Sequence, residues 1–252
     1  MYFLTAFLAS LMGFVMGFLG SGGSILTMPT LVYVLGFDPK NAIPLSLVIV
    51  GLTATMGFIQ RLRQKMVDLT AGLFFGFTGI VGTFVGSRLS RFFTGAEQMI
   101  LFAAVMMTAA FFMAWRGLKK SSLTPADPGK ISYPLAVLLG GIVGMLTGLV
   151  GVGGGFLIVP ALTSVGLGVP VAMGTSLMVI AFNCLSGILS YAGQTDIDWR
   201  TAALFLFFSG SASLAGARLA KNVDGKKMSL AFAVFIFLLG LAILYKNREV
   251  FL

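Results

Sequence analysis

The chain has 252 residues, of which 58% are hydrophobic and 10% are charged, with a formal net charge of +9 and a mean hydropathy of +1.00. Because a soluble domain carries about 25% charged residues, this composition excludes an ordinary soluble fold and predicts an all-α polytopic membrane protein. The basic residues lie mainly in short stretches between apolar segments, as topology demands, so the net charge does not indicate nucleic-acid binding.

The residue inventory also excludes the common catalytic and metal-binding chemistries. The chain has no histidine and a single cysteine, Cys184. Ser-His and Cys-His catalysis and the usual histidine metal sites are therefore ruled out within it. We expect no catalytic residue, metal site or cofactor, and the expected partners are membrane lipids and a small solute rather than nucleic acid.

Ten apolar segments are expected in chain order, because a hydrocarbon core of ~30 Å takes about 20 apolar residues per helix. The first, MYFLTAFLASLMGFVMGFLG, has no basic n-region and predicts a spanning helix rather than a cleaved signal peptide. The second and seventh are too short to span untilted and predict broken or re-entrant helices. The segments are 2–19, 24–36, 42–60, 69–89, 97–115, 133–150, 155–167, 171–192, 199–219 and 228–245.

The two halves of the chain repeat one another. GFLGSGGSILTMPTL at 17–31 aligns with GLVGVGGGFLIVPAL at 148–162 at an offset of 131. SLVIV at 46–50 then aligns with SLMVI at 176–180 at an offset of 130. The repeat is therefore about five segments long.

The repeat predicts two transmembrane units, at 1–115 and 133–252, joined by a cytoplasmic linker at 116–132. Since five is odd, the copies enter the membrane in opposite orientations, which is the inverted-repeat architecture of many secondary transporters. An eight-span alternative has parallel copies and splits the basic residues about 10 to 7. Ten crossings with the N-terminus outside place 11 of 17 inside and are favoured. Under either count the basic loop at 61–65 is cytoplasmic.

Each repeat places a glycine cluster directly before its short segment. In lipid, a helix break is tolerated only where it is buried in protein or lines a watery cavity. A break also creates a helix N-terminus, whose free N–H groups and positive dipole end attract anions. We predict that two such ends face each other near the midplane and clasp one small anion. The candidate substrate-binding residues in the clusters are Ser21, Gly22, Gly23, Ser24, Gly153, Gly154 and Gly155.

Close helix packing is the alternative role for these glycines. It is the preferred interpretation for the outer glycines, whereas both interpretations stay open for the inner ones. The proline that follows each cluster, Pro29 or Pro160, is expected to end or kink its short helix. The outer glycines are Gly17, Gly20, Gly148 and Gly151.

These motifs resemble the sulfite exporter TauE/SafE family of bacterial inner-membrane permeases. The resemblance covers essentially the full chain and is carried by GSGGSILTMP and GVGGGFLIVP, the duplication, the basic central linker and the pair GSRLSR and GARLAK. It implies a multi-pass transporter of a sulfur-containing anion such as sulfite, sulfoacetate or another organosulfonate. Substrates vary among members. The first cluster has Ser21 and Ser24 where the second has Val152 and Gly155.

Polar side chains inside the apolar segments form a second group of candidates, because such groups are costly in lipid and are often functional. Ser46 and Ser176 occupy equivalent positions after the short segments, and Thr175 precedes Ser176. Asn183 lies deep in the eighth segment, and its amide offers two donors to an oxyanion. The alternative for each is a cap or an interhelical hydrogen bond.

Charged residues flank the segments at equivalent positions. Asp68 and Asp198 precede apolar runs and are expected to be helix N-caps, with proton coupling as the alternative. Arg88 and Arg218 stand near helix ends and are expected to snorkel to headgroups, with attraction of an anion to the pore mouth as the alternative.

The expected activity is export or exchange by alternating access. An inside-negative potential expels a dianion with about 4.6 kcal/mol per 100 mV, at ~2.3 kcal/mol per charge. No histidine and no carboxylate lies deep in a segment to carry a coupling proton. An anion channel of the same fold and proton-coupled uptake remain the alternatives.

Overall fold

The structure is a computed structural model that describes residues 2–19, 24–118, 132–150, 155–191, 198–219 and 225–246. The regular structure in these ranges is helical throughout, which confirms the all-α prediction. Two short irregular helices, the π-helical η1 (Thr30–Val34) and the 3-10 turn η2 (Ser90–Phe92), continue α2 and α4. The α-helices are α1 (Tyr2–Leu19), α2 (Ser24–Pro29), α3 (Pro39–Arg63), α4 (Leu69–Leu89), α5 (Gly95–Leu118), α6 (Tyr133–Val150), α7 (Gly155–Val165), α8 (Val169–Tyr191), α9 (Trp199–Leu219) and α10 (Gly225–Lys246).

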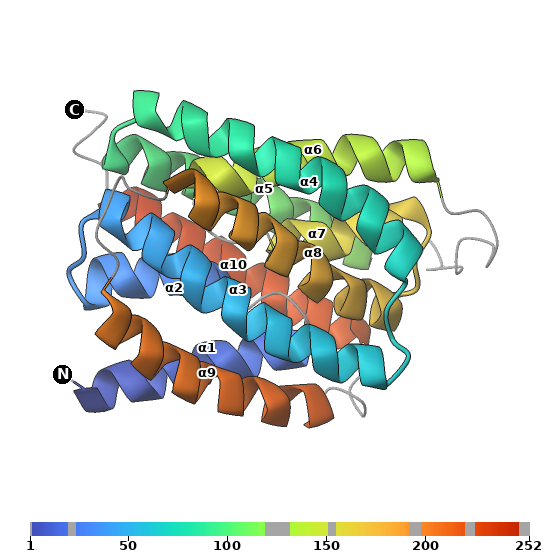
Figure 1. Cartoon of the computed structure of the whole chain (residues 1–252), viewed down its shortest axis with the longest axis horizontal. Coiled ribbons are helices and arrows are strands. Elements are labelled where there is room, and N and C mark those ends of the chain that lie inside the picture. Colours follow the sequence, from blue (N-terminus) through green and yellow to red (C-terminus); the bar gives the residue numbers. More distant parts are fainter. Residues whose placement is uncertain are drawn as a thin grey trace.

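The helix boundaries recur at equivalent positions of the sequence repeat. Ser24 begins α2, and the residue aligned with it, Gly155, begins α7. Leu69 begins α4 and its counterpart Trp199 begins α9, and both of these helices have 21 residues. Counterparts run in opposite directions in Figure 1: α3 runs from left to right and α8 from right to left, while α4 runs leftward and α9 rightward.

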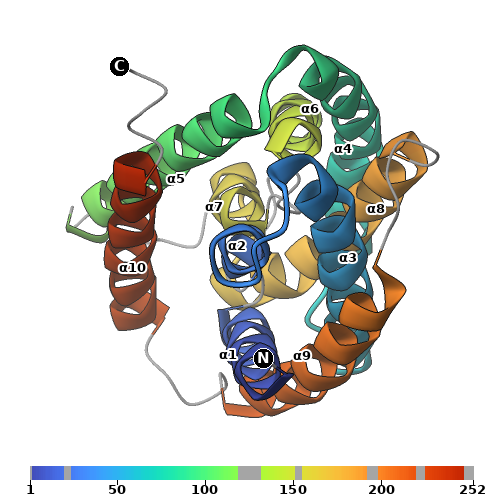
Figure 2. The same cartoon turned by 90° about the vertical axis from the view of Figure 1, so that its left-hand side faces the viewer.

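The two short helices lie in the middle of the bundle. Figure 2, an end-on view, shows α2 and α7 surrounded by the longer helices. Their side chains are correspondingly buried, with Ile25 and Met28 of α2 and Ile158 and Leu162 of α7 all fully enclosed. A short helix that is apolar on all sides is stable only inside such a shell, so the long helices fix where α2 and α7 lie.

Glycines let the long helices approach closely. A Cβ atom on Gly17 of α1 would overlap the carbonyl oxygen of Ser213 on α9. The equivalent Gly148 of α6 stands in the same relation to Thr83 on α4. The packing role predicted for Gly17 and Gly148 is therefore confirmed, while Gly20 and Gly151 lie outside the described residues.

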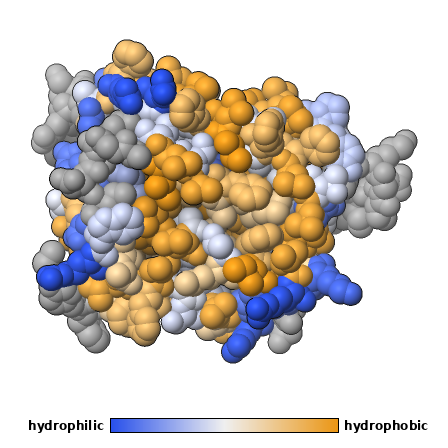
Figure 3. Space-filling model, viewed as in Figure 1, coloured by the Kyte–Doolittle hydropathy of each residue, from blue (hydrophilic) through white to orange (hydrophobic). Residues whose placement is uncertain are grey.

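The surface is that of a membrane protein. Among the described residues, four helices, α3, α4 with η2, α6 and α8, are long and apolar enough to cross a membrane. Figure 3 shows apolar side chains across the middle of the molecule and hydrophilic ones toward its two ends. Phe77 of α4 and its repeat counterpart Phe207 of α9 are each 70% exposed, as expected of side chains that face lipid.

Several expected boundaries differ from the observed ones. The third segment was expected to end at residue 60, with a basic loop at 61–65, but α3 continues to Arg63 and buries Arg61. The helix α5 extends to Leu118, so the first residues of the expected linker are helical. Residues 119–131 of that linker lie outside the described residues.

The two prolines behave differently. Pro29 is the last residue of α2, where the chain passes into the π-helical turn η1. Pro160 lies inside α7, which continues to Val165. A proline removes one N–H donor from the helix ladder, and the wider π turn is one way to accommodate that loss. The expectation of an ended or kinked helix is confirmed for Pro29.

Candidate functional site

The short helices begin directly after the two glycine clusters. Ser24 is the first residue of α2, and the buried Gly155 is the first residue of α7. The two helices are in contact. In Figure 1, α2 lies toward the left end, where its chain continues into α3, and α7 toward the right end, where its chain continues into α8. The predicted cluster residues outside the described residues are Ser21, Gly22, Gly23, Gly153 and Gly154.

The predicted serines of α3 and α8 are fully buried and bonded to their own helices. The Ser46 hydroxyl donates to the Ile43 carbonyl oxygen at 2.8 Å. The equivalent Ser176 hydroxyl donates to the Met173 carbonyl oxygen, also at 2.8 Å. Such bonds to a preceding carbonyl satisfy a buried hydroxyl within a helix, so they give both serines a structural reason to be tolerated in the core.

The structure does not bring Ser46 and Ser176 together. The helices α3 and α8 pack antiparallel, and a Cβ on Gly57 of α3 would lie 3.1 Å from Leu177 of α8. Ser176 is therefore level with Gly57, whereas Ser46 lies 11 residues earlier on α3. At 1.5 Å per residue this is roughly 16 Å along the helix. The two serines stand at opposite ends of the α3–α8 contact.

Asn183 of α8 is fully buried, and neither its amide nitrogen nor its amide oxygen has a hydrogen-bond partner. Its amide lies against Gly79 of α4, in the space that a Cβ on that glycine would need. A buried amide without a partner costs about 1–3 kcal/mol. The alternative of an interhelical hydrogen bond is therefore wrong for Asn183 in this conformation, and its two donors stay available.

Thr175 joins α8 to the start of α4. Its hydroxyl oxygen accepts a hydrogen bond from the Asp68 backbone N–H at 2.9 Å. One residue earlier on α8, a Cβ on Gly174 would overlap the Met66 carbonyl oxygen. Thr175 is fully buried, and this contact gives it a structural role at the end of the bundle where α3 ends and α8 begins.

The two aspartates cap helices, as predicted. The Asp68 carboxylate accepts from the Ala71 N–H at 2.9 Å at the start of α4. The Asp198 carboxylate accepts from the Thr201 N–H at 3.1 Å and from the Thr201 hydroxyl at 2.7 Å at the start of α9. The hydrogen bond from the Thr201 hydroxyl is the main reason that the pKa of Asp198 is lowered from its ordinary value.

The described arginines differ sharply in their surroundings. The exposed Arg88 lies over the Phe84 ring, with its guanidinium carbon 4.8 Å from the ring centroid. Arg61 is only 3% exposed. Sequence reasoning missed Arg61, since it stands in a run of basic residues that resembles a cytoplasmic loop. One sequence signal could have revealed it. At an offset of 130, Arg61 aligns with Tyr191, which lies inside the apolar eighth segment and not in a loop.

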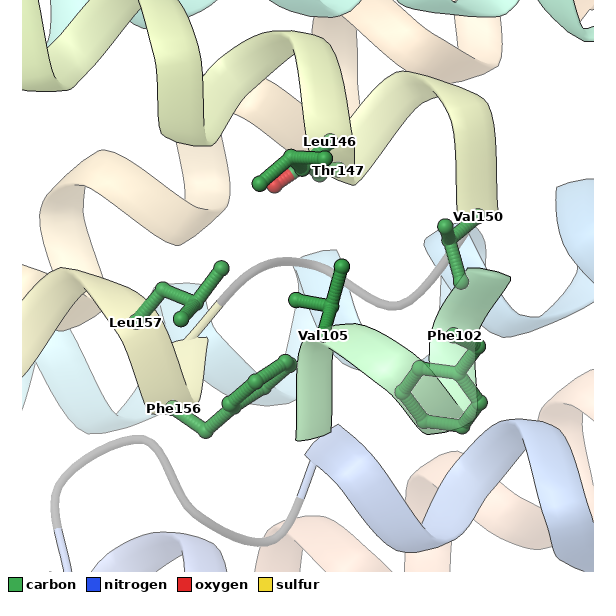
Figure 4. Close-up of a pocket in the computed structure, with 7 residues that line it drawn as sticks. All are labelled: Phe102, Val105, Leu146, Thr147, Val150, Phe156 and Leu157. Atoms are coloured by element: carbon green, nitrogen blue, oxygen red, sulfur yellow. The ribbon is translucent and has the colours of Figure 1, made fainter. Parts of the chain in front are cut away.

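One small pocket among the described residues lies between α5, α6 and α7 (Figure 4). Its walls are apolar, with Phe102 of α5, Leu146 of α6 and Phe156 of α7 among them. The one polar side chain in its lining, Thr147, donates its hydroxyl to the Val143 carbonyl oxygen at 2.9 Å. The described residues of its lining therefore offer an anion no free side-chain donor and no cation.

Comparison with known proteins agrees with this membrane architecture. The chain is 28% identical over 244 residues to a probable membrane transporter protein of Xylella fastidiosa (strain 9a5c), covering 94% of this chain and 92% of that protein. It is 25% identical over 257 residues to the probable membrane transporter protein YunE of Bacillus subtilis (strain 168), covering 93% and 94%. It is 24% identical over 248 residues to the probable membrane transporter protein YfcA of Escherichia coli (strain K12), covering 96% and 89%.

No solved structure matches the chain. The family profile described as "Sulfite exporter TauE/SafE" matches residues 4–243, which is nearly the whole chain. The apolar surface across the middle of the molecule and the ten α-helices of the described residues are consistent with the membrane transporters to which the sequence is similar. The resemblance noted from the glycine motifs is therefore confirmed, and the chain belongs to the sulfite exporter TauE/SafE family of membrane transporters.

Proposed function

We propose that the chain is a secondary transporter that moves a small sulfur-containing anion, such as sulfite, sulfoacetate or another organosulfonate, in export or exchange by alternating access. The family description and the names of the relatives support membrane transport of this kind. The observation that carries the proposal is the pair of short helices, α2 and α7, which begin in the middle of the bundle directly after glycine clusters.

Helix N-termini are suited to this substrate. The first N–H groups of a helix have no partner within the helix, and the dipole favours negative charge there. Two such ends offer an anion several donors without a permanent positive charge. Binding is therefore favourable but weak enough for the anion to be released. We include in the proposed substrate path both the cluster residues and the buried polar side chains. The set is Ser21, Gly22, Gly23, Ser24, Ser46, Gly153, Gly154, Gly155, Thr175, Ser176 and Asn183.

We also propose that the two halves form inverted repeats related by a pseudo-two-fold axis in the membrane plane. The recurrence of helix boundaries at equivalent positions of the two halves and the opposite directions of α3 and α8 support this arrangement. So do the equivalent contacts of Gly17 with α9 and Gly148 with α4. Alternating access then follows when the two halves exchange their conformations, which turns an opening on one side of the membrane into an opening on the other.

The proposed location is the bacterial inner membrane, with the N-terminus outside and the 116–132 linker in the cytoplasm. The excess of Lys and Arg on the linker side supports this orientation. Labelling intact cells with a membrane-impermeant thiol reagent tests it, using Ser122→Cys in a Cys184→Ala chain. Labelling only after lysis is expected, and labelling of intact cells would reverse the topology.

Anion flux in proteoliposomes tests the function. The panel is sulfite, thiosulfate, sulfoacetate, taurine, sulfate and chloride, with the membrane potential and the pH gradient clamped separately. Saturable flux of a sulfur anion with counterflow is expected. Ohmic current without counterflow would make the protein a channel instead. No flux of any anion would overturn the proposed substrate class.

A paired glycine variant locates the path. Gly22→Leu combined with Gly153→Leu fills both clusters and is expected to abolish flux. The matched control is Gly141→Leu in α6, because a Cβ on Gly141 meets no atom within 4 Å. Flux that survives in the cluster variant would return those glycines to a packing role.

A further inference from the structure

Arg61 is a buried cation that makes few hydrogen bonds to the described residues. Its side chain is 3% exposed. Its Nη2 donates to the Gly17 carbonyl oxygen at 3.5 Å, and its Nη1 donates to the Met66 sulfur at 3.6 Å. The contact with the Gly17 oxygen is at the long limit for a hydrogen bond, and the Met66 sulfur is a weak acceptor. The Nε has no partner, although a guanidinium carries five N–H donors in all.

No carboxylate in the described chain neutralises this charge. The structure gives Arg61 no acidic partner there. The described carboxylate nearest to it in sequence, Asp68, is occupied as the N-cap of α4. A buried charge is ordinarily paired or fully hydrogen-bonded, because desolvation costs several kcal/mol per ion. A buried guanidinium with no acidic partner among the described residues therefore points to a ligand as its partner.

The repeat supplies an internal comparison. Tyr191 occupies in α8 the position that Arg61 occupies in α3, at an offset of 130. Its hydroxyl lies 3.0 Å from the Gly148 carbonyl oxygen, which is the counterpart of Gly17. It also lies 2.7 Å from the Ser90 hydroxyl oxygen. A neutral side chain thus makes the equivalent helix-to-helix contact, so the contact itself does not require the positive charge of Arg61.

The position of Arg61 suits an entrance to the proposed path. It contacts the last turn of α1, three residues before Gly20 opens the first glycine cluster. Through Met66 it also adjoins the start of α8, because the Met66 carbonyl oxygen lies against Gly174. In Figure 1 this is the right-hand end of the molecule, where α3 ends and α8 begins. It is the end to which we assign the cytoplasmic side.

We propose that the Arg61 guanidinium binds the transported oxyanion at the linker-side end of the path. This inference rests on the proposed function and adds to it a charged recognition residue that only one of the two repeats carries. The planar guanidinium can donate two parallel hydrogen bonds to two oxygens of a sulfite or sulfonate group. It selects anions with at least two oxygens on one centre over chloride. The anion in turn supplies the charge partner that the described chain lacks.

Anion binding to the purified protein in detergent tests this independently of transport. Thermal unfolding is followed with added sulfite, sulfoacetate, sulfate or chloride in the wild type, Arg61→Gln, Arg61→Lys and Arg61→Tyr. The tyrosine variant copies the second repeat and is chosen to keep the contact with Gly17. The matched control is Arg63→Gln, which removes the same charge from an exposed side chain two residues away.

The wild type and Arg63→Gln are expected to be stabilised by sulfite or sulfoacetate but not by chloride. Arg61→Gln and Arg61→Tyr are expected to bind at least tenfold more weakly, as for loss of a hydrogen-bonded charge. Arg61→Lys keeps the charge but loses the two parallel hydrogen bonds of the guanidinium, so its affinity is expected to lie between that of the wild type and that of Arg61→Gln. Equal binding by Arg61→Tyr and the wild type, or no anion binding by the wild type, would overturn the inference.

Two further measurements separate other outcomes. A lipid phosphate has the same chemistry as the proposed ligand, so the unfolding series is repeated with added phosphatidylglycerol. Stabilisation by this lipid and not by sulfite would make Arg61 a headgroup contact and overturn the inference. In proteoliposomes, sulfur-anion flux that is equal in Arg61→Gln and wild type would overturn it while leaving the proposed function standing. Absence of wild-type flux alongside Arg61-dependent binding would overturn the function and leave the site.

Discussion

Asn183 of α8 and Gly79 of α4 form a matched pair, in which the amide of one side chain lies in the space left by the missing side chain of the other. The pair has a counterpart in the repeat. At the equivalent positions, the Thr53 hydroxyl of α3 and the Ser209 hydroxyl of α9 are hydrogen-bonded at 2.9 Å. The first contact leaves two polar atoms without partners, whereas the second joins two hydroxyls. We therefore expect the Asn183 amide to act in transport and the Thr53–Ser209 hydrogen bond to act in stability.

Asn183→Leu is expected to leave stability unchanged or to raise it, while lowering anion flux at least tenfold. An apolar side chain of similar size removes a buried amide whose hydrogen bonds are unmade, and that removal costs nothing in the fold. The loss of flux follows if the amide donates to the substrate. Thermal unfolding in detergent and flux in proteoliposomes measure the two effects. Unchanged flux would remove Asn183 from the proposed path.

Thr53→Val is the counterpart of that variant and is expected to behave in the opposite way. It deletes the bonds to the Ile49 carbonyl oxygen at 2.7 Å and to Ser209, and it leaves a buried hydroxyl on α9 without this partner. We expect a loss of about 1–3 kcal/mol in stability with flux per folded molecule retained. A stable variant that no longer transports would assign Thr53 to the path instead.

Gly148→Ala is expected to destabilise the protein by about 1–3 kcal/mol, because overfilling a close-packed contact forces the backbone apart. The added methyl group would overlap the Thr83 carbonyl oxygen on α4. Gly141→Ala in the same helix is the control, since a Cβ there meets no atom within 4 Å. That variant is expected to be neutral or slightly stabilised, because alanine favours helix by about 1 kcal/mol. Equal melting temperatures for both variants would contradict the close approach of α4 and α6.

Asp198→Ala is expected to lower the melting temperature near neutral pH by removing the cap of α9, at a cost of about 0.5–2 kcal/mol. The pKa of Asp198 is lowered in the folded protein, chiefly by the Thr201 hydroxyl. Its stabilising effect is therefore complete above the ordinary aspartate pKa of about 4 and is lost as the pH falls through the lowered value. The melting temperatures of both proteins, followed from pH 7 downward, are expected to draw together only once the pH falls below the ordinary aspartate value. A difference that does not narrow as the pH falls further would show that the carboxylate charge is not what caps the helix.

Transport of a dianion is expected to follow the membrane potential without a proton gradient. At ~2.3 kcal/mol per charge, a potential of about 100 mV shifts the equilibrium distribution of a dianion roughly a thousandfold. Potassium gradients with valinomycin set the potential, and strongly buffered solutions of equal pH on the two sides remove the pH gradient alone. Flux that collapses on removal of the pH gradient alone would replace the export proposal with proton-coupled transport.

Much of the fold could be predicted from the sequence because its causes are local. The apolar segments that became α1, α4, α6 and α9 were expected with the boundaries observed, since length, hydropathy and capping residues mark them. Asp68 and Asp198 were recognised as caps because the signal lies within three residues of the helix start. Boundaries were less certain where apolar and polar residues mix, as at the end of α3.

The candidate site could be predicted only in part. The glycine clusters and Asn183 could be named from composition, because a broken helix or an amide inside an apolar segment is costly wherever it occurs. The separation of Ser46 from Ser176 could not, because identical sequence positions in two antiparallel helices lie at opposite ends of their contact. The burial of Arg61 could not be predicted either, because the basic residues around it are equally typical of an exposed loop.

The sequence by itself determined that this protein is helical and lies in a membrane, because the length and hydropathy of the apolar segments can be read along the chain. It also predicts two copies of one five-segment unit, from the aligned motifs of the two halves. Only the tertiary structure decided which polar groups are satisfied. In the folded chain the Tyr191 and Thr53 hydroxyls are hydrogen-bonded, whereas the Arg61 Nε and the Asn183 amide have no partners. Burial and partnership depend on what neighbouring helices bring to a position, and that is a property of packing rather than of sequence.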